Sequence, residues 1–156
     1  MLSTTSSPSD CSNEPAKTPT EHTSCPCGSG RTYETCCKPY HEKQAVPETP
    51  EQMMRSRYTA FVLGLVDYII ATTHRQSESY SKATAFWREQ LRRYCKQTEF
   101  VGLEVLSASP VTPQSTQGTV HFIASLKLDP ITKPETVTRQ EEHSQFLKVG
   151  GRWLFC

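Results

Sequence analysis

The spacing of apolar positions changes after about residue 96, from a helical period to the period of two that is typical of strands. Before that point, apolar side chains recur every three or four residues, at Met54, Tyr58, Phe61, Val62, Leu65 and Ile69. Thr49, Pro50 and Gln52 have the residue types and the spacing of a capped helix start. Gly64 is expected to end or bend this helix, so we predict a second short helix over 66–73.

The remaining elements follow from the same patterns. A third helix is predicted over 81–96, with an apolar side made of Phe86, Trp87, Leu91 and Tyr94. Strands are predicted at 100–106, 118–128, 136–149 and 152–156, and Gly150-Gly151 is typical of a hairpin turn. Helices followed by antiparallel strands predict the α+β class, with the helices packed on one face of a curved sheet.

The composition divides the chain into three parts. Residues 1–24 contain fourteen Ser, Thr or Pro residues and almost no large apolar side chain, so we expect a disordered tail there. Residues 25–43 form a cysteine-rich module. Residues 44–156 hold nearly all of the aliphatic and aromatic side chains and are long enough for one hydrophobic core.

The charge balance limits the kinds of partner. The 156 residues carry 17 basic and 16 acidic side chains, a formal net charge of +1. This balance argues against a chain built mainly to coat nucleic acid or an anionic membrane, because it creates no strong field. No run of about 18 apolar residues is present, and the first ten residues lack the basic and apolar regions of a secretory signal. We therefore expect a cytoplasmic protein.

The crowding of cysteines is the most informative feature of the sequence. Four of the seven lie within thirteen positions, at Cys25, Cys27, Cys36 and Cys37. This C-x-C-x8-C-C spacing suits a tetrahedral zinc site of four thiolates. Gly28 and Gly30 permit a tight turn. We expect Ser29 to cap a short helix over 31–37 that returns the last two cysteines to the metal.

Two other interpretations of the module stay open on spacing alone. A reduced Cys-x-Cys pair also occurs in redox-active sites, and adjacent cysteines also occur as plain core residues. The remaining thiols, Cys11, Cys95 and Cys156, have no ligand spacing.

The module and the sequence after it resemble a known family. CPCGSGRTYETCC, residues 25–37, looks like the SEC-C motif, the small zinc module at the C-terminus of the translocase ATPase SecA. The stretch MRSRYTAF, residues 54–61, and residues 142–153 resemble the YchJ-type family of uncharacterised bacterial proteins. The resemblance covers about residues 25–155. It implies one zinc ion per chain and a nuclear transport factor 2-like domain, a cone of three helices and a bent antiparallel sheet.

The resemblance also implies a role as a docking adaptor for a protein or the ribosome. From the charge balance and the lack of a long apolar run, we expect no membrane and no specific DNA as partner. The expected docking surface consists of Arg31, Tyr33, Lys38, Tyr40 and Lys43. In the alternative interpretation, zinc only fixes the N-terminal part to the cone. Domains of this shape often pair through the outer face of the sheet, so we also expect a homodimer.

The second functional hypothesis is a small-molecule or catalytic pocket inside the cone. Its polar candidates are Arg55, Arg57, Asp67, His74, Glu142 and His143. Arg55 and Arg57 point about 200° apart on a helix, so at most one of them faces a pocket. Arg57 is the better placed, and a pair with Glu142 would be as good a structural as a catalytic explanation.

Catalytic signals are otherwise weak. Asp67 and His74 lie two helical turns apart, about 10 Å, which is too far for a direct hydrogen bond on a continuous helix. The sequence contains no nucleophile elbow, phosphate loop or HExxH motif. We therefore lean against an enzyme.

Overall fold

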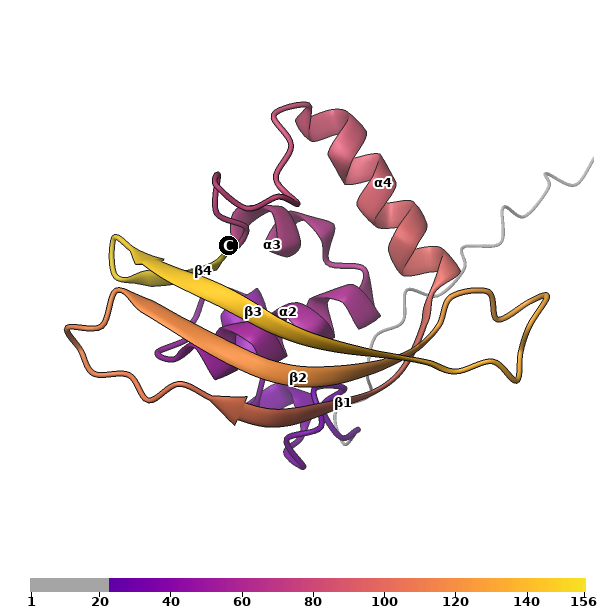
Figure 1. The fold of residues 1–156 in the computed structure, drawn as a ribbon, viewed down its shortest axis with the longest axis horizontal. Helices are drawn as coiled ribbons and strands as arrows, with labels where there is room; N and C mark the ends of the chain where they lie inside the picture. Colours follow the sequence, from indigo (N-terminus) through magenta and orange to yellow (C-terminus); the bar gives the residue numbers. More distant parts are fainter. Residues whose placement is uncertain (1–22) are drawn as a thin grey trace, which may run out of the picture.

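A curved antiparallel sheet with helices on one face dominates the computed structural model, which describes residues 23–156 (Figure 1). The expected tail, residues 1–24, lies outside the described residues except for its last two. The cysteine module contains two short helices, η1 (Tyr33–Thr35) and α1 (Lys38–His41).

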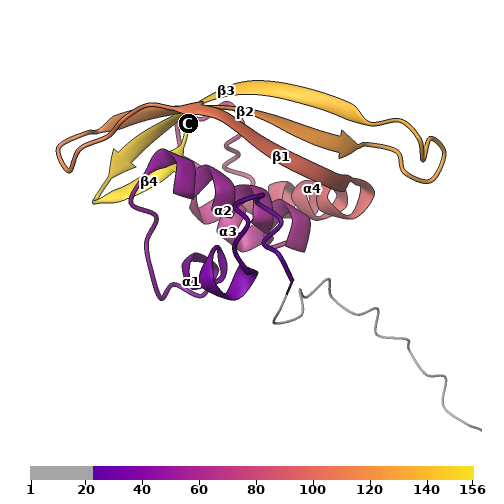
Figure 2. The same ribbon diagram turned by 90° about the horizontal axis from the view of Figure 1, so that it is seen from below.

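Residues 44–156, which we call the cone, show the predicted order of helices before strands. The elements are α2 (Pro50–Leu63), α3 (Val66–Ala71), α4 (Thr84–Gln97), β1 (Glu99–Ala108), β2 (Gln117–Lys127), β3 (Thr138–Val149) and β4 (Arg152–Phe155). Each strand pairs antiparallel with the next one along the chain. Figure 2 shows the sheet arching over the helices. The predicted α+β class and nuclear transport factor 2-like architecture are confirmed.

Helix α2 begins and ends where the sequence predicted. The Thr49 hydroxyl accepts a hydrogen bond from the backbone N–H of Gln52 at 3.2 Å. The Gln52 side chain accepts from the backbone N–H of Glu48 instead of Thr49, so the capping box is shifted by one residue. At the other end Gly64 takes a left-handed conformation, with φ of 71°, and α3 begins two residues later.

The main hydrophobic core lies between α2 and the inner face of the sheet. Trp153, Phe146 and Val120 are almost completely buried and pack against two methionines of α2. The indole N–H of Trp153 donates to the carbonyl oxygen of Glu48 at 3.0 Å, which ties the last strand to the segment before α2. Within residues 23–156, no helix combines the length and the apolar character needed to cross a bilayer.

The module differs from its prediction, because the expected helix over 31–37 does not form. Thr32 is extended, with φ of −70° and ψ of 153°, and forms an isolated β-bridge with Ser24. Helical backbone therefore starts only after it, as a three-residue 3₁₀ helix. The Ser29 side chain caps no helix; its hydroxyl accepts from the backbone N–H of Arg31 at 3.2 Å.

Candidate functional site

The four cysteines of the module form a compact, buried cluster. Cys25, Cys27, Cys36 and Cys37 are between 0 and 8% exposed, and their Sγ atoms all lie within 4.8 Å of one another. The Sγ–Sγ distance is 3.5 Å for Cys27 and Cys36 and 3.9 Å for Cys36 and Cys37. A tetrahedral site with metal–sulfur bonds of about 2.3 Å has S···S distances of about 3.8 Å. The cluster therefore fits a tetrahedral, thiophilic metal ion.

Hydrogen bonds among the clustered thiols shift the pKa values of three of them in opposite directions. Hydrogen bonds with Cys25 and Cys37 lower the pKa of Cys27 far below its ordinary value. The pKa of Cys25 is raised to about 11, chiefly by its hydrogen bond with Cys27. Hydrogen bonds with Cys25 and Cys27 also raise the pKa of Cys37. These shifts favour the thiolate at Cys27 and the neutral thiol at Cys25 and Cys37, and a divalent cation bound there would ionise these two thiols.

Two contacts hold the first turn of the module against the cone. Nη1 of Arg55, on α2, donates to the carbonyl oxygen of Cys27 at 2.6 Å. Gly28 has φ of 74° and approaches β1 so closely that a Cβ atom there would lie 2.9 Å from the carbonyl oxygen of Leu103. Arg55, a pocket candidate in the sequence, thus belongs to the junction between module and cone.

His41, which the sequence analysis did not single out, connects the module to the cone at a second point. Its Nε2 lies 2.8 Å from the carbonyl oxygen of Ser56, so this nitrogen carries the proton and donates. Nδ1 then accepts from the Tyr33 hydroxyl at 2.9 Å. Burial lowers the pKa of His41, which favours the neutral ring that this arrangement requires.

Three of the five expected docking residues make side-chain contacts within the module. The Tyr33 hydroxyl is turned to His41, as described above. The Lys38 ammonium lies 2.8 Å from a carboxylate oxygen of Glu34. The guanidinium group of Arg31 donates to the carbonyl oxygen of Thr35. These contacts reduce what the three side chains offer to a partner.

Arg31 and the remaining two expected docking residues, Tyr40 and Lys43, lie on the outside of the module. Arg31 and Lys43 are exposed, and Tyr40 is half-buried. Arg31 and Tyr40 border a groove of about 270 Å³ between the module and α2. The remaining lining residues of the groove are Ser29, Cys36, Cys37, Thr49, Glu51, Gln52 and Arg55.

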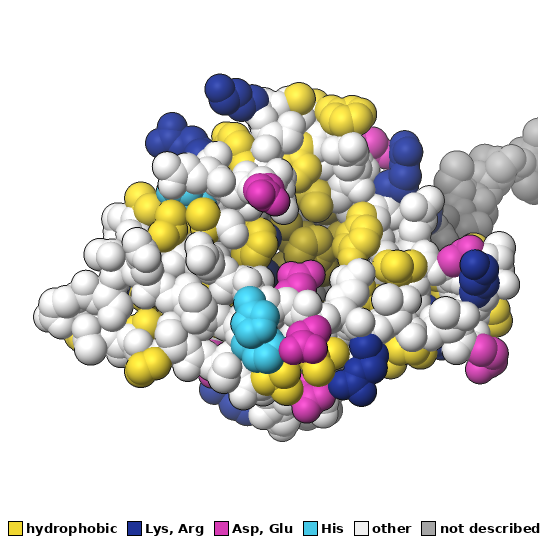
Figure 3. All heavy atoms as spheres, in the orientation of Figure 1, with side chains coloured by type: hydrophobic (Ala, Val, Ile, Leu, Met, Phe, Trp, Pro, Cys, Tyr) yellow, Lys and Arg dark blue, Asp and Glu magenta, His cyan; other side chains and the backbone are white. Residues whose placement is uncertain are grey.

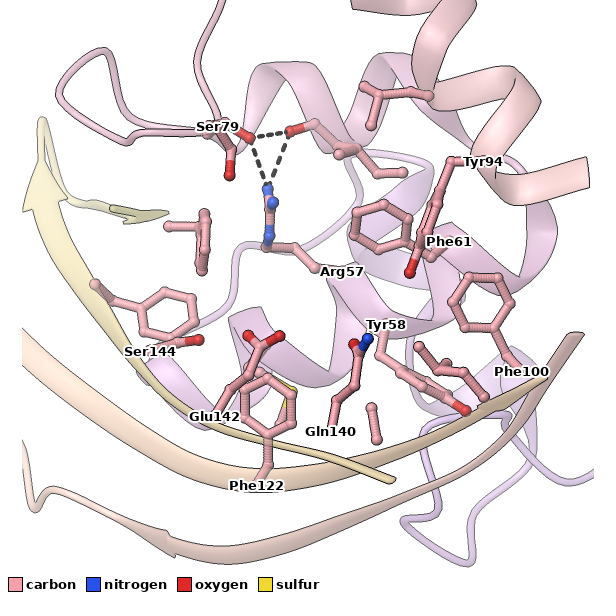
Figure 4. A pocket seen from close by; sticks show the side chains of 18 of the residues that line it. Arg57, Tyr58, Phe61, Ser79, Tyr94, Phe100, Phe122, Gln140, Glu142 and Ser144 are labelled. Carbon is pink, nitrogen blue, oxygen red and sulfur yellow. Dashed lines mark hydrogen bonds between the residues drawn. The ribbon is translucent and has the colours of Figure 1, made fainter. Parts of the chain in front are cut away.

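A larger apolar cavity, of about 330 Å³, lies between the helices and the inner face of the sheet (Figure 4). Its aromatic walls include Phe61, Trp87, Tyr94, Phe100, Phe122, Phe146 and Phe155. Its charged or polar lining residues are Arg57, Thr73, Ser79, Gln140, Glu142 and Ser144. Figure 3 shows a hollow floored by hydrophobic side chains, with an acidic side chain at its rim.

Arg57 turns into this cavity, but the expected pair with Glu142 does not form. Nη1 of Arg57 donates to the carbonyl oxygen of Ile69 at 3.0 Å and to the hydroxyls of Thr72 and Thr73 at 2.7 and 3.1 Å. These acceptors lie at the C-terminal end of α3, where carbonyl groups attract a cation. Glu142 lies on β3 and is exposed, which leaves its carboxylate in water.

Asp67 and His74 form no dyad, in agreement with the sequence analysis. Asp67 pairs with Arg88 of α4 at 2.9 Å. Nδ1 of His74 accepts from the backbone N–H of Gln76, and the backbone N–H of His74 donates to the carbonyl oxygen of Phe155 at 2.7 Å. Both side chains thus serve local structure, and neither lines the cavity.

A second group of possible metal ligands lies on the outer face of the sheet. His121 and His143 are partners across β2 and β3, and their rings stack at 3.7 Å. Oε1 of Glu141 lies 2.6 Å from Nε2 of His121, and the ligand atoms of all three lie within 4.8 Å. The sequence analysis missed this group and placed His143 among the pocket candidates. Strand alternation puts His143 on the face opposite to Glu142.

Comparisons with known proteins agree with this architecture. A family profile described as YchJ, middle NTF2-like domain, matches residues 49–156. A UPF0225 protein of Haemophilus influenzae (strain PittEE) is 39% identical over 131 residues, which are 84% of this chain and 74% of that protein. A UPF0225 protein of Pectobacterium carotovorum is 38% identical over 133 residues, 85% of this chain and 80% of that protein. The chain belongs to the YchJ-like UPF0225 family.

Solved structures and a second profile extend the UPF0225 assignment to the module. The SEC-C motif profile matches residues 23–39, which include all four clustered cysteines. A SEC-C motif containing protein from Rhodopseudomonas palustris superposes with a TM-score of 0.69 at 34% identity, covering 84% of this UPF0225 chain and 93% of that one. A SEC-C motif containing protein from Psychrobacter arcticus gives 0.68 at 27% identity, with coverage of 86% and 81%.

Proposed function

We propose that the chain is a zinc-binding docking adaptor. One Zn²⁺ per chain is held by the four thiolates of Cys25, Cys27, Cys36 and Cys37, and the outer surface of the module binds a protein partner. The observation that carries the proposal is the buried cluster of four thiols within 4.8 Å, inside the segment that matches the SEC-C motif. Four cysteines in a closed tetrahedron are a typical ligand set of structural zinc.

The composition of the module explains why a metal would be needed. Among residues 25–43 only the four cysteines are buried. In so short a segment, the free energy of metal binding takes the place of a hydrophobic core. Zinc thus determines whether the docking surface has a fixed shape.

The exposed surface of the module favours a protein partner over RNA. Arg31 and Lys43 are exposed there, next to the half-buried Tyr40. RNA binding usually rests on many phosphate contacts, and two exposed cations with one aromatic ring supply few. We therefore favour an acidic protein surface, either free or part of the ribosome.

The metal content of the purified protein tests the zinc site. We expect one zinc per chain in the wild type and no zinc in the variant Cys25→Ser/Cys27→Ser, whose cone should still unfold cooperatively. Cys95→Ser is the matched control, because Cys95 is buried on α4 outside the cluster, and it should keep the zinc. A wild-type protein with reduced thiols and no zinc would overturn the proposal.

Charge reversal tests the docking surface. We expect Arg31→Glu/Lys43→Glu to abolish co-sedimentation with purified bacterial ribosomes and cross-linking to ribosomal proteins, while the zinc content stays unchanged. Arg75→Glu/Lys133→Glu reverses the same charges at exposed positions of the cone and should bind like the wild type. Equal binding by both variants, or cross-links that form to ribosomal RNA and not to ribosomal proteins, would contradict the proposed protein-docking surface.

Two further expectations belong to the same proposal. Zinc thiolates require a reducing compartment, which supports a cytoplasmic location. A homodimer would use the outer face of the sheet, where Ile123 alternates with the inward-facing Phe122 and Ala124. Light scattering of the wild type and of Ile123→Glu tests the dimer, which the substitution should dissociate.

A second candidate function, binding of a small molecule, is favoured by the cavity of the cone. Its volume of about 330 Å³ lies at the lower end of ligand pockets, which span about 300–1,000 Å³, and its walls are apolar with a few polar groups. We propose that such a ligand raises the melting temperature of the wild type and of Cys25→Ser/Cys27→Ser alike.

A further inference from the structure

The cavity of the cone contains a buried cation that no carboxylate of the described residues neutralises. Arg57 is only 7% exposed and lines the cavity. Its hydrogen-bond acceptors are one carbonyl oxygen and two hydroxyls, all neutral. Within residues 23–156, none of the ion pairs includes Arg57. Arginine is almost never fully buried without an anionic partner, so a counter-charge is missing here.

Two nitrogens of the Arg57 guanidinium group, Nε and Nη2, are available to bind the missing anionic partner. Nη1 makes all three hydrogen bonds of Arg57. No buried side-chain nitrogen or oxygen of residues 23–156 lacks a partner, so Nε and Nη2 are not enclosed by protein. They therefore face accessible space, and the space beside Arg57 is the cavity. Nε–H and Nη2–H form a fork that can receive both oxygens of one carboxylate.

The orientation of the guanidinium group is fixed before any ligand binds. The ring of Phe155 stacks on it, with its centroid 4.6 Å from Cζ of Arg57. The three hydrogen bonds of Nη1 hold the outer end of the guanidinium group in place. Burial lowers the pKa of Arg57 to about 10, so the group remains charged at neutral pH. A cation held in this way loses little conformational entropy on binding.

The walls of the cavity suit a flat, apolar body. Phe61, Tyr94 and Phe100 form an aromatic wall whose ring centroids lie 5.9 to 6.2 Å apart. Figure 4 shows this wall beside Arg57, with Phe122 and Glu142 rising from the sheet below. Aromatic rings at such a wall stack or make edge contacts with the ring of a ligand.

We propose that the cavity binds a small aromatic monocarboxylate, whose carboxylate lies on Nε and Nη2 of Arg57 and whose ring lies among Phe61, Tyr94 and Phe100. The proposal rests on the second candidate function above and adds the chemical class of the ligand. A cavity of about 330 Å³ admits a body of one or two rings. Glu142 also lines the cavity, and its charge disfavours a second carboxylate on the ligand.

Matched pairs of ligands test the role of charge without changing the protein. Phenylacetate, cinnamate and indoleacetate are titrated into the full chain beside their primary amides, which have nearly the same shape, and binding is followed by NMR. We expect the best acid to bind about tenfold or more tightly than its amide. Equal affinities would overturn the carboxylate assignment and leave the pocket function standing. No binding by any compound at millimolar concentration would overturn both.

Two variants then assign the anion to Arg57. Arg57→Lys keeps the charge and removes the fork, so it should weaken binding of the acid about tenfold and leave that of the amide unchanged. Glu142→Gln changes only an exposed side chain and should strengthen binding of the acid, which keeps the test valid even if Arg57→Lys folds poorly. Weaker binding of the acid to Glu142→Gln would contradict the proposed site.

Discussion

Single side chains of α2 serve different parts of the molecule. Arg55 reaches the carbonyl oxygen of Cys27 in the module, and Arg57, two positions later, reaches the cavity. The two side chains thus lie on different sides of the helix, as the helical period predicts, and only Arg57 lines the cavity of the cone, whereas Arg55 borders the groove beside the module. The sequence could not predict which of the two arginines contacts the module, because the position of the module relative to α2 is a tertiary property.

The first prediction concerns the Arg55 contact. Arg55→Ala should lower the free energy of unfolding by about 2 kcal/mol, because it removes a hydrogen bond from a charged donor to a carbonyl of the module. Arg88→Ala is the matched control: its pair with the exposed Asp67 should contribute less than about 1 kcal/mol. Urea denaturation measures both. Equal losses would show that Arg55 does not fasten the module.

The second prediction concerns His41 and pH. Burial lowers the pKa of His41 in the folded protein below its ordinary value of 6.5. Below that value the unfolded chain takes up a proton that the folded chain resists, so the free energy of unfolding should fall as the pH falls. His41→Asn should flatten this dependence in urea titrations between about pH 7.5 and 5.5. His143→Asn, at an exposed position on the outer face, should keep it.

If the free energy of unfolding depended on pH in the same way in His41→Asn and in the wild type, the proposed contribution of His41 would be contradicted. The zinc content is measured at each pH, because protonation of thiolates releases the metal and would add a dependence of its own.

At the scale of elements, local chemistry explains the helix and strand ends that were predicted well. Thr49 and Gly64 bound α2 because a cap and a left-handed residue act on their own backbone. The predicted strand 118–128 differs from β2 by one residue at each end, since alternation of apolar residues persists along it. The helix over 31–37 was wrong because Thr32 is held extended by pairing with Ser24, a partner that periodicity does not reveal.

The third prediction compares two glycines of the module turn. Gly28 and Gly30 both have positive φ, 74° and 81°, so alanine at either position should cost about 1 kcal/mol. Only Gly28 also faces backbone, the carbonyl oxygen of Leu103, whereas nothing lies within 4 Å of a Cβ at Gly30. Gly28→Ala should therefore destabilise the protein clearly more in urea denaturation. Equal costs would contradict the close contact between the module and β1.

At the scale of the whole molecule, the module is built into the cone. It contacts α2 through Arg55 and Ser56, and β1 through Gly28. A third contact to α2 joins Sγ of Cys25 to the hydroxyl of Thr59 at 3.6 Å. The cysteine cluster is therefore coupled to the central helix of the cone.

The fourth prediction follows from this coupling. Removing the metal with a chelator should lower the melting temperature and speed amide exchange in residues 25–43 and also in residues 55–59 of α2. The β2–β3 ladder, which is farther from the cluster, should keep its protection and serves as the internal control. Faster exchange confined to the module would show that the two parts are energetically independent.

The sequence alone determined the class, the order of elements, both ends of α2 and the four clustered cysteines, because these depend on periodicity and short-range backbone chemistry. Only the tertiary structure decided the surroundings of His41, of Arg57 and of the His121–His143 pair. Their partners lie far along the chain, and strand register and helix packing bring them together. Register and packing are set by the burial of all elements at once, so no local pattern could reveal these contacts.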